Sequence, residues 1–334
     1  MFKRPRLRPK DKLVNAACAV SVLFFAASCS DTQPAPSEAD RTLPQITPQT
    51  ETAPAQDGLT LPAVWNTSAL SAQPTSVGVA GGLSSLIAIS DVTGALQILD
   101  FQARIITEPT DLAVREVADG QYTRLSGIGL TLFPGISQSG DLRIYIHGGE
   151  LAQPIEYELD IEQAGPAAGL CTASPTRDSD GVLRLGYWTQ TDQETLNSGR
   201  VVNVNDQLVF LADEPVQANA PITSCILEDT GVSVFSEPVR SAVRLNRFGN
   251  AYTVTLDTSG NLAHINSRQE ADTISVRDGL SVYMPPLPLD LGATGDARNG
   301  GYPGGVIVAV GEARDGYRAV LIDPSPLTLD PLAP

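Results

Sequence analysis

The sequence has very little lysine, and this shortage limits its partners. Its three lysines, Lys3, Lys10 and Lys12, all lie near the N-terminus. Acidic residues number 38 against 22 basic ones, which gives a formal net charge of −16. A chain of this charge repels polyanions over long distances. We therefore expect no nucleic-acid partner.

Histidine and the common catalytic motifs are also scarce. The two histidines, His147 and His264, have no neighbouring Cys or His at the spacing of a zinc site. The chain contains neither a G-x-S-x-G elbow nor a phosphate-cradling P-loop. These absences exclude the common hydrolases and nucleotide-binding proteins that depend on those motifs.

No apolar run reaches the roughly 20 residues that cross a bilayer as a helix. The run LVNAACAVSVLFFAAS follows a basic N-terminal segment and ends in small residues before Cys29. This end resembles a bacterial lipobox, although Ala26 replaces the usual leucine. We expect residues 1–28 to be a lipoprotein signal peptide and Cys29 to be lipidated. Plain secretion or a retained anchor is the alternative.

Ser30 and the segment over residues 29–58 indicate in which membrane the protein is anchored and how its folded part is attached. Ser30 does not match the inner-membrane retention pattern of Gram-negative lipoproteins, so the resemblance implies the outer membrane, facing the periplasm or the exterior. Residues 29–58 are rich in Pro, Thr, Gln and acids, which predicts a disordered tether. Loss of residues 1–28 removes six basic residues and one acidic residue, so the charge moves from −16 to −21.

From residue 59 onward the chain repeats short β-hairpins. The clearest case predicts strands over 86–90 and 96–100 around a turn at Thr93-Gly94, and a third strand over 104–106. Four later segments follow the same plan, with no helical period of useful length between them. Hairpins at this spacing predict an all-β fold, a β-propeller in the first place and a pair of β-sandwiches as the alternative.

Several segments occur in an order that resembles one family. They include LPAVWNT (61–67), ISDVTGALQILDFQARII (89–106), RLSGIGL (124–130) and GDLRIYIHGG (140–149), followed by AGLCTASPTRDSDGVLRLGYWTQ (168–190), ITSCILED (222–229) and VRDGLSVY (276–283). This order resembles the β-propeller phytases (3-phytases), calcium-dependent phosphatases of inositol hexakisphosphate. The resemblance covers about residues 59 to 322. It implies a six-bladed, phytase-like propeller over residues 59–334.

The departures from the family pattern fall on its chemistry. Family positions that bind calcium or phosphate through charged or amide side chains are occupied here by Thr60, Leu61, Val92, Ser126, Gly127, Gly129, Ser137, Pro238 and Val276. Calcium needs six to eight oxygen ligands in one place. We therefore expect a degenerate site with no retained catalytic residue and no resident cofactor.

Some acids survive at or near the family's positions. They are candidate ligands of a reduced calcium site: Asp91, Glu228, Asp229, Glu237 and Asp278. The alternative is that they are solvated acids at turns and strand ends of an acidic protein.

Two cysteines, Cys171 and Cys225, remain in the expected body. Export places them in an oxidising compartment, and each lies near the start of a strand in blades that should be neighbours. We expect a disulfide between them. A pair of buried free thiols is the alternative.

Two functions remain open at this stage. The first is a non-catalytic propeller, held by its lipid anchor, that binds an envelope protein through the remodelled mouth of the old site. The second is a calcium-dependent phosphatase of altered specificity. Arginines elsewhere would then have formed a new anion site, and the candidates are Arg124, Arg177 and Arg277.

Lipidation of Cys29 gives the first prediction. Cys29→Ser should release the protein from membranes, because the acyl chains that hold it would no longer be attached. Fractionation of cells that produce the parent or the variant measures this. A variant that sediments with membranes as the parent does would overturn the lipobox assignment.

Overall fold

The computed structural model describes residues 59–173, 181–228, 231–247, 249–266, 269–296 and 302–327. The chain divides into two compact units, Met1–Pro54 and Ala55–Pro334, and all described residues belong to the second. The predicted signal peptide, Cys29, the tether over 29–58 and Asp229 lie outside the described residues, so these expectations stay predictions.

Every regular element within the described ranges is a β-strand, which confirms the all-β prediction. No helix in this part of the chain is long and apolar enough to cross a membrane. Three sheets are built from consecutive strands, and the fourth is a single hairpin. Their strands are β2 (Pro74–Ala80), β3 (Leu86–Asp91), β4 (Ala95–Asp100) and β5 (Thr110–Asp111); β6 (Val114–Val117), β7 (Gln121–Leu125), β8 (Ile128–Ser137), β9 (Leu142–Gly148) and β10 (Ile155–Glu158); β11 (Ala167–Ala173), β12 (Gly181–Thr189), β13 (Thr195–Val204), β14 (Gln207–Ala212) and β15 (Val216–Gln217); and β16 (Ser224–Leu227) with β17 (Val232–Phe235).

The last sheet contains both ends of the described chain. The first strand, β1, pairs antiparallel with β24 and, over a few residues, parallel with β21. This pairing covers an edge that would otherwise expose unpaired backbone groups. The order in this eight-stranded sheet is β18 (Val239–Arg247), β19 (Asn250–Asp257), β20 (Leu262–Ile265), β21 (Ala271–Arg277), β1 (Leu59–Asn66), β24 (Gly316–Ile322), β23 (Val306–Ala313) and β22 (Pro288–Thr294).

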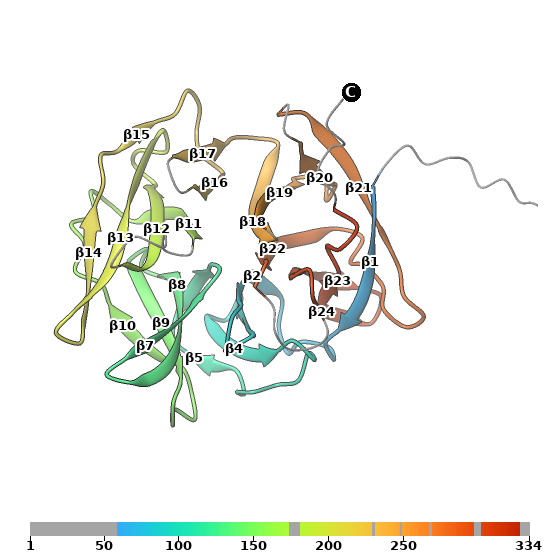
Figure 1. The fold of residues 1–334 in the computed structure, drawn as a ribbon, viewed down its shortest axis with the longest axis horizontal. Helices are drawn as coiled ribbons and strands as arrows, with labels where there is room; N and C mark the ends of the chain where they lie inside the picture. Colours follow the sequence, from blue (N-terminus) through green and yellow to red (C-terminus); the bar gives the residue numbers. More distant parts are fainter. Residues whose placement is uncertain are drawn as a thin grey trace, which may run out of the picture. The chain divides into compact units, whose positions relative to one another are not determined.

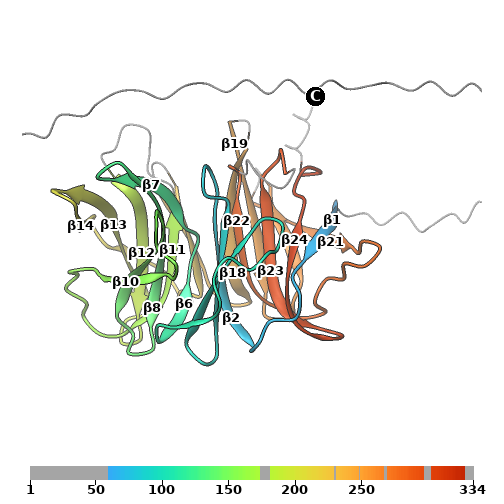
Figure 2. The same cartoon turned by 90° about the horizontal axis from the view of Figure 1, so that it is seen from below.

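The sheets stand side by side around a common centre (Figure 1). The strands nearest to this centre are β2, β6, β11, β16, β18 and β22, and we call them the inner strands. Seen from the side, the strands run across the thickness of the unit (Figure 2). Antiparallel sheets arranged radially in this way form a β-propeller.

The apolar core lies in layers between successive sheets. One layer packs Ile87 and Val77 of the first sheet against Val308 of the last. Another packs Ile98 of the first sheet against Phe133 of the second. Because alternate residues of a strand point to opposite faces, the first sheet contributes to both of these layers, and both of its faces are apolar. Consecutive apolar residues in the strands follow from this arrangement.

The first hairpin forms as its turn chemistry predicts, but the expected third strand is wrong. The Asp91 Oδ1 atom accepts hydrogen bonds from the backbone N–H groups of Thr93 (2.8 Å) and Ala95 (3.2 Å), which fixes the turn. Residues 104–106 form only an isolated bridge between Ile105 and Leu99. The outer strand β5 follows a few residues later, because the chain first loops around Asp100, whose carboxylate accepts from two backbone N–H groups of that loop.

Cys171 and Cys225 form a disulfide, which confirms the prediction. Cys171 lies on β11 and Cys225 on β16, so the bond joins two inner strands of different sheets, with a Cα–Cα distance of 5.6 Å. Both cysteines are buried, in a cluster with Trp188, Leu196 and Ile222. Since β16 has only one strand paired to it, the covalent link holds the smallest sheet to a larger neighbour.

Removal of this disulfide should destabilise the fold. The bond closes a loop with a sequence separation of 54, and loop entropy gives about 4 kcal/mol for a loop of that length. The double variant Cys171→Ala, Cys225→Ala should lose free energy of unfolding of that order in guanidinium titrations. Parent-like stability of the variant, or free thiols in the denatured, unreduced parent, would contradict the prediction.

Candidate functional site: a polar cavity between the inner strands

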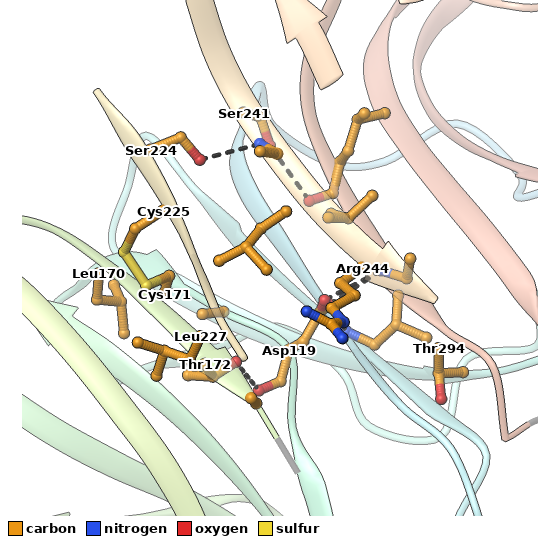
Figure 3. Close-up of a pocket in the computed structure, with 18 of the residues that line it drawn as sticks. Asp119, Leu170, Cys171, Thr172, Ser224, Cys225, Leu227, Ser241, Arg244 and Thr294 are labelled. Carbon is orange, nitrogen blue, oxygen red and sulfur yellow. Dashed lines mark hydrogen bonds between the residues drawn. A yellow bond between two sulfur atoms is a disulfide. The ribbon is translucent and has the colours of Figure 1, made fainter. Parts of the chain in front are cut away.

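A cavity of about 210 Å³ lies at the centre, where all six inner strands contribute to its wall. Its lining is rich in charged side chains. They are Glu116, Asp119, Arg240, Arg244, Asp290 and Asp296. Figure 3 shows Asp119, Arg244 and Thr294 among the lining residues, with the disulfide on the opposite side of the view. We call this space the central cavity.

Side chains connect neighbouring inner strands, since no backbone ladder joins them. The Ser76 hydroxyl on β2 accepts from the Val117 N–H on β6 at 2.7 Å. The Ser224 hydroxyl on β16 accepts from the Ala242 N–H on β18 at 2.9 Å. Each contact satisfies a backbone donor on the strand edge that faces the centre.

Asp119 makes the most extensive of these connections. Its Oδ1 atom accepts from the Val79 N–H on β2 at 2.8 Å and from the Ala293 N–H on β22 at 3.1 Å. Its backbone carbonyl accepts from the Thr172 hydroxyl on β11 at 2.7 Å (Figure 3). One residue therefore holds together three inner strands besides the sheet from which it comes.

Asp290 makes a similar contact between β22 and β2, two residues nearer the start of β2 than the contact of Asp119 with Val79. Its Oδ2 atom accepts from the Val77 N–H at 2.9 Å. Val77 and Val79 thus meet Asp290 and Ala293 in the same chain order, so β2 and β22 run in the same direction. Ser76 contacts Val117 and Val79 contacts Asp119, again in the same chain order, so β2 and β6 also run in the same direction. The first residues of these inner strands therefore lie at one end of the cavity.

Burial changes the acidity of the cavity's carboxyl groups. Loss of water raises the pKa of Asp119 to about 8, and its N–H donors only partly oppose this. Burial and the nearby Asp290 charge raise the pKa of Glu116 to about 7. Burial also raises the pKa of Asp290 to about 6, against hydrogen bonds from Val77 and Ser241 and the charge of Arg240. Around neutral pH the cavity is therefore less negative than its composition suggests.

The alternation of β18 directs its polar residues to the cavity. Arg240, Arg244 and Asn246 line it, whereas Leu245, and Val243 in part, are buried in an apolar cluster formed mainly by residues of the same eight-stranded sheet. Arg244 pairs with Glu228 at 3.5 Å and donates to Asn246 at 3.2 Å. Arg240 is exposed and makes no hydrogen bond or ion pair with any residue that the structure describes.

A shallower hollow adjoins the central cavity, and we call it the outer depression. Its volume is about 340 Å³, and its wall includes Trp188, Gln193, Glu237 and Thr258. Arg240 lines both spaces. Arg240 therefore lies where the outer depression meets the central cavity, close to the first residues of β18.

The predicted calcium ligands that the structure describes each have a local role. Asp91 fixes its own turn, and Asp278 accepts from the Met284 N–H at 3.0 Å. Glu228 accepts from the Ser233 hydroxyl at 2.9 Å and pairs with Arg244. Glu237 lies in the wall of the outer depression.

Glu228 and Glu237 flank the β16–β17 hairpin at opposite ends. Pairing runs from Ser224 with Phe235 to Leu227 with Val232, so the two acids are separated by the length of the hairpin. At about 3.3 Å per residue this is roughly 10 Å or more, whereas ligands of one calcium ion bind at about 2.4 Å. The hairpin therefore does not bring these two acids together.

Within the described ranges, no three His, Cys, Asp or Glu side chains are grouped as a metal site requires. His147 and His264 lie on β9 and β20, in different sheets. Calcium binding by the predicted acids stays a prediction.

The acids and the two arginines that line the central cavity were not predicted from the sequence. Glu116, Asp119 and Asp290 lie in or directly after short inner strands, in the segments VREVAD and PLDLGAT. VREVAD places Arg115, Glu116 and Asp119 among two valines and an alanine, and PLDLGAT places Asp290 between two leucines. These charged residues within strand-forming segments were the available signal. Charged residues are rarely buried without a partner, so their positions indicated either a cavity or an inter-strand contact.

Comparisons with known proteins give only distant structural similarities. No protein-family model and no curated protein match the chain. Among solved structures, a triple arginine-to-alanine variant of AofleA from Arthrobotrys oligospora is 11% identical and matches over 78% of this chain and 87% of its own, with a TM-score of 0.47. BBS1N in complex with ARL6DN is 12% identical over 72% of this chain and 75% of its own, with a TM-score of 0.40. Raptor from Chaetomium thermophilum is 7% identical over 80% of this chain and 29% of its own, with a TM-score of 0.43.

These TM-scores are all below 0.5, so the fold assignment depends on the strand pairing described above. The resemblance to phytases stays a prediction.

The raised pKa of Asp119 predicts a pH dependence of stability. Its carboxyl ionises near 3.8 ordinarily and near 8 in the folded state. Between these values the folded state holds a proton that the unfolded chain has lost, so this group's contribution to the free energy of unfolding falls as pH rises. Asp119→Asn should reduce the loss of stability between pH 5 and pH 8 in urea titrations.

Asp315→Asn serves as the matched control. Asp315 is exposed and pairs with Arg318, which lowers its pKa, so it stays ionised across this pH interval. The control should keep the parent's pH dependence. An Asp119→Asn variant with that same dependence would show that Asp119 is not protonated in the fold.

Proposed function

We propose that this chain is a non-catalytic, phytase-like β-propeller that is tethered to the cell envelope and binds a partner at the outer depression. We further propose six blades, in which the eight-stranded sheet counts as two: β18–β21, and β22–β24 completed by β1. The first and last strands would then close one blade together.

The use of the cavity's acids is the main observation that supports a non-catalytic role. A calcium-dependent phosphatase needs carboxylate oxygens that converge on metal ions. Here the carboxylates of Asp119 and Asp290 accept hydrogen bonds from backbone N–H groups of neighbouring inner strands. Oxygens engaged in this way hold the sheets together, and their raised pKa values oppose the ionised state that calcium requires.

The outer depression supports binding. It combines the apolar Ile222 and the ring of Trp188 with Gln193, Glu237 and Arg240. Interfaces that bind proteins typically place aromatic and arginine side chains together within a polar rim. The expected partner is an envelope protein, since the anchor would keep the chain at the membrane.

Phosphate release from phytate at millimolar calcium tests the non-catalytic half of the proposal. We expect no turnover above background, because losing even one preorganised charge-stabilising contact typically lowers rates about 10²- to 10³-fold, and several are absent here. Asp278→Ala with Glu237→Ala is the matched variant. Calcium-dependent turnover that this double variant abolishes would instead establish the alternative, a phosphatase of altered specificity.

Site-specific photo-crosslinking in intact cells is the assay for the binding half. A photoreactive residue at Gln193, in the outer depression, should give a discrete crosslinked species. The same residue at the exposed Asp206, in the β13–β14 turn, should not. Equal crosslinking at both positions, or none at Gln193, would contradict a binding role for the outer depression.

A further inference from the structure

Two opposite charges in the central cavity have unused hydrogen-bonding capacity. Arg240 makes no polar contact with any described residue, although it lines the cavity. Glu116 accepts one hydrogen bond, from the Leu170 N–H to Oε1 at 3.4 Å. Its Oε2 atom accepts none from the described residues. Every other carboxylate that faces this end of the cavity is engaged by backbone donors.

These two groups lie at the same level of the inner strands. Ser241, next to Arg240, donates to the Leu291 carbonyl, and Leu291 follows Asp290. Asp290 accepts from Val77. On the other side of β2, Ser76 accepts from Val117, the neighbour of Glu116. A chain of contacts between adjacent inner strands thus runs from Arg240 to Glu116 at one height.

We propose that the central cavity binds a small zwitterion that carries one carboxylate and one ammonium group, such as an amino acid. The ligand's carboxylate accepts hydrogen bonds from the Arg240 guanidinium, whose planar donors match a carboxylate. Its ammonium group donates to Glu116 Oε2. This assignment depends on the proposed binding function and names the ligand class of the space behind the outer depression.

Ligands of a single charge fit this pair less well. A simple carboxylate on Arg240 would lie near the carboxyl groups of Glu116 and Asp290 and would bring no positive group to Glu116. A simple amine on Glu116 would share the cavity with the positive charge of Arg240 and would bring no negative group to it. Like charges placed together at a binding site disfavour the wrong ligand. A zwitterion satisfies both groups at once, so the pair selects for it.

The size of the cavity also limits the ligand. At about 210 Å³, the space is smaller than the roughly 300 Å³ at which pockets for drug-sized molecules begin. A short amino acid is of suitable size, and a hexakisphosphate is not. Arg240 borders the outer depression as well, so the proposed carboxylate site lies next to that hollow.

Tryptophan fluorescence offers a direct measurement. The sequence has two tryptophans, Trp65 and Trp188, and only Trp188 lines both spaces. In a Trp65→Phe background the emission comes from Trp188 alone. Glycine, β-alanine and 4-aminobutyrate are titrated against this protein, with acetate and ethylamine as single-charge analogues and calorimetry as an independent readout.

We expect at least one of the zwitterions to bind about tenfold or more tightly than either analogue, because hydrogen bonds to charged groups typically contribute that much. Arg240→Gln should weaken binding by a similar factor, and Arg240→Lys by less. Glu116→Gln should weaken it as well. Arg104→Gln, which removes an exposed arginine that pairs with Asp100 elsewhere, is the control and should leave binding unchanged.

Acetate binding as tight as that of the best zwitterion, or binding that survives Arg240→Gln, would overturn the assignment. Absence of binding by all three zwitterions would also overturn it. Melting curves of each variant show whether a loss of binding reflects unfolding. Phosphate release is measured in the same preparations. Turnover there would refute the proposed function, whereas absence of binding without turnover would refute only this inference.

Discussion

Hydrogen bonds that backbone N–H groups of one inner strand donate to side-chain oxygens of a neighbouring blade are the contacts on which this arrangement of sheets depends. An inner strand pairs with its own sheet on one edge, and its other edge presents donors to the centre. A buried donor without an acceptor costs about 1–3 kcal/mol. Asp119 alone satisfies Val79 and Ala293, on two different strands. Ser76 adds a second contact between β2 and β6, and Ser224 makes the corresponding contact between β16 and β18. Because these acceptors point across gaps between sheets, they set the relative height of the strands as well as satisfying donors.

This use of carboxylates has an electrostatic consequence. Burying Asp119, Glu116 and Asp290 together raises the pKa of each, since burial disfavours their charged forms. A protein with a formal charge of −16 therefore has a centre that carries less negative charge than its residue types imply. Arg240 and Arg244 offset part of what remains. The centre and the surface thus differ in their electrostatic character, which allows a ligand with a negative group to enter a strongly acidic protein.

The sequence allowed some features to be predicted because they depend on local chemistry. The first hairpin forms as expected, since Asp91 and Gly94 suit its turn wherever the hairpin lies. The Cys171–Cys225 pair followed from export and from cysteine count. The cavity could not be predicted in this way. Whether Glu116 or Arg240 faces the centre depends on the register and height of strands from different sheets, which no local pattern specifies. The same limit explains why Glu228 and Glu237, close in sequence, lie at opposite ends of one hairpin.

The polar side chains of the central cavity differ in whether the fold already satisfies their hydrogen-bonding groups. Asp119 and Asp290 are buried acids of the kind found in catalytic or metal sites. Their carboxylate oxygens, however, accept hydrogen bonds from backbone N–H groups of neighbouring strands. Arg244 is similarly engaged by Glu228 and Asn246. Arg240, on the same face of β18, is not, and it stands at the junction of the cavity and the outer depression. The charge of Arg240 acts on Asp290, whose pKa it lowers against the effect of burial, but its guanidinium makes no hydrogen bond or ion pair with a described residue and is therefore available to a ligand. Glu116 is a second such group, of opposite charge, because its Oε2 atom accepts no hydrogen bond from the described residues. It is therefore available to a positively charged group of the same ligand.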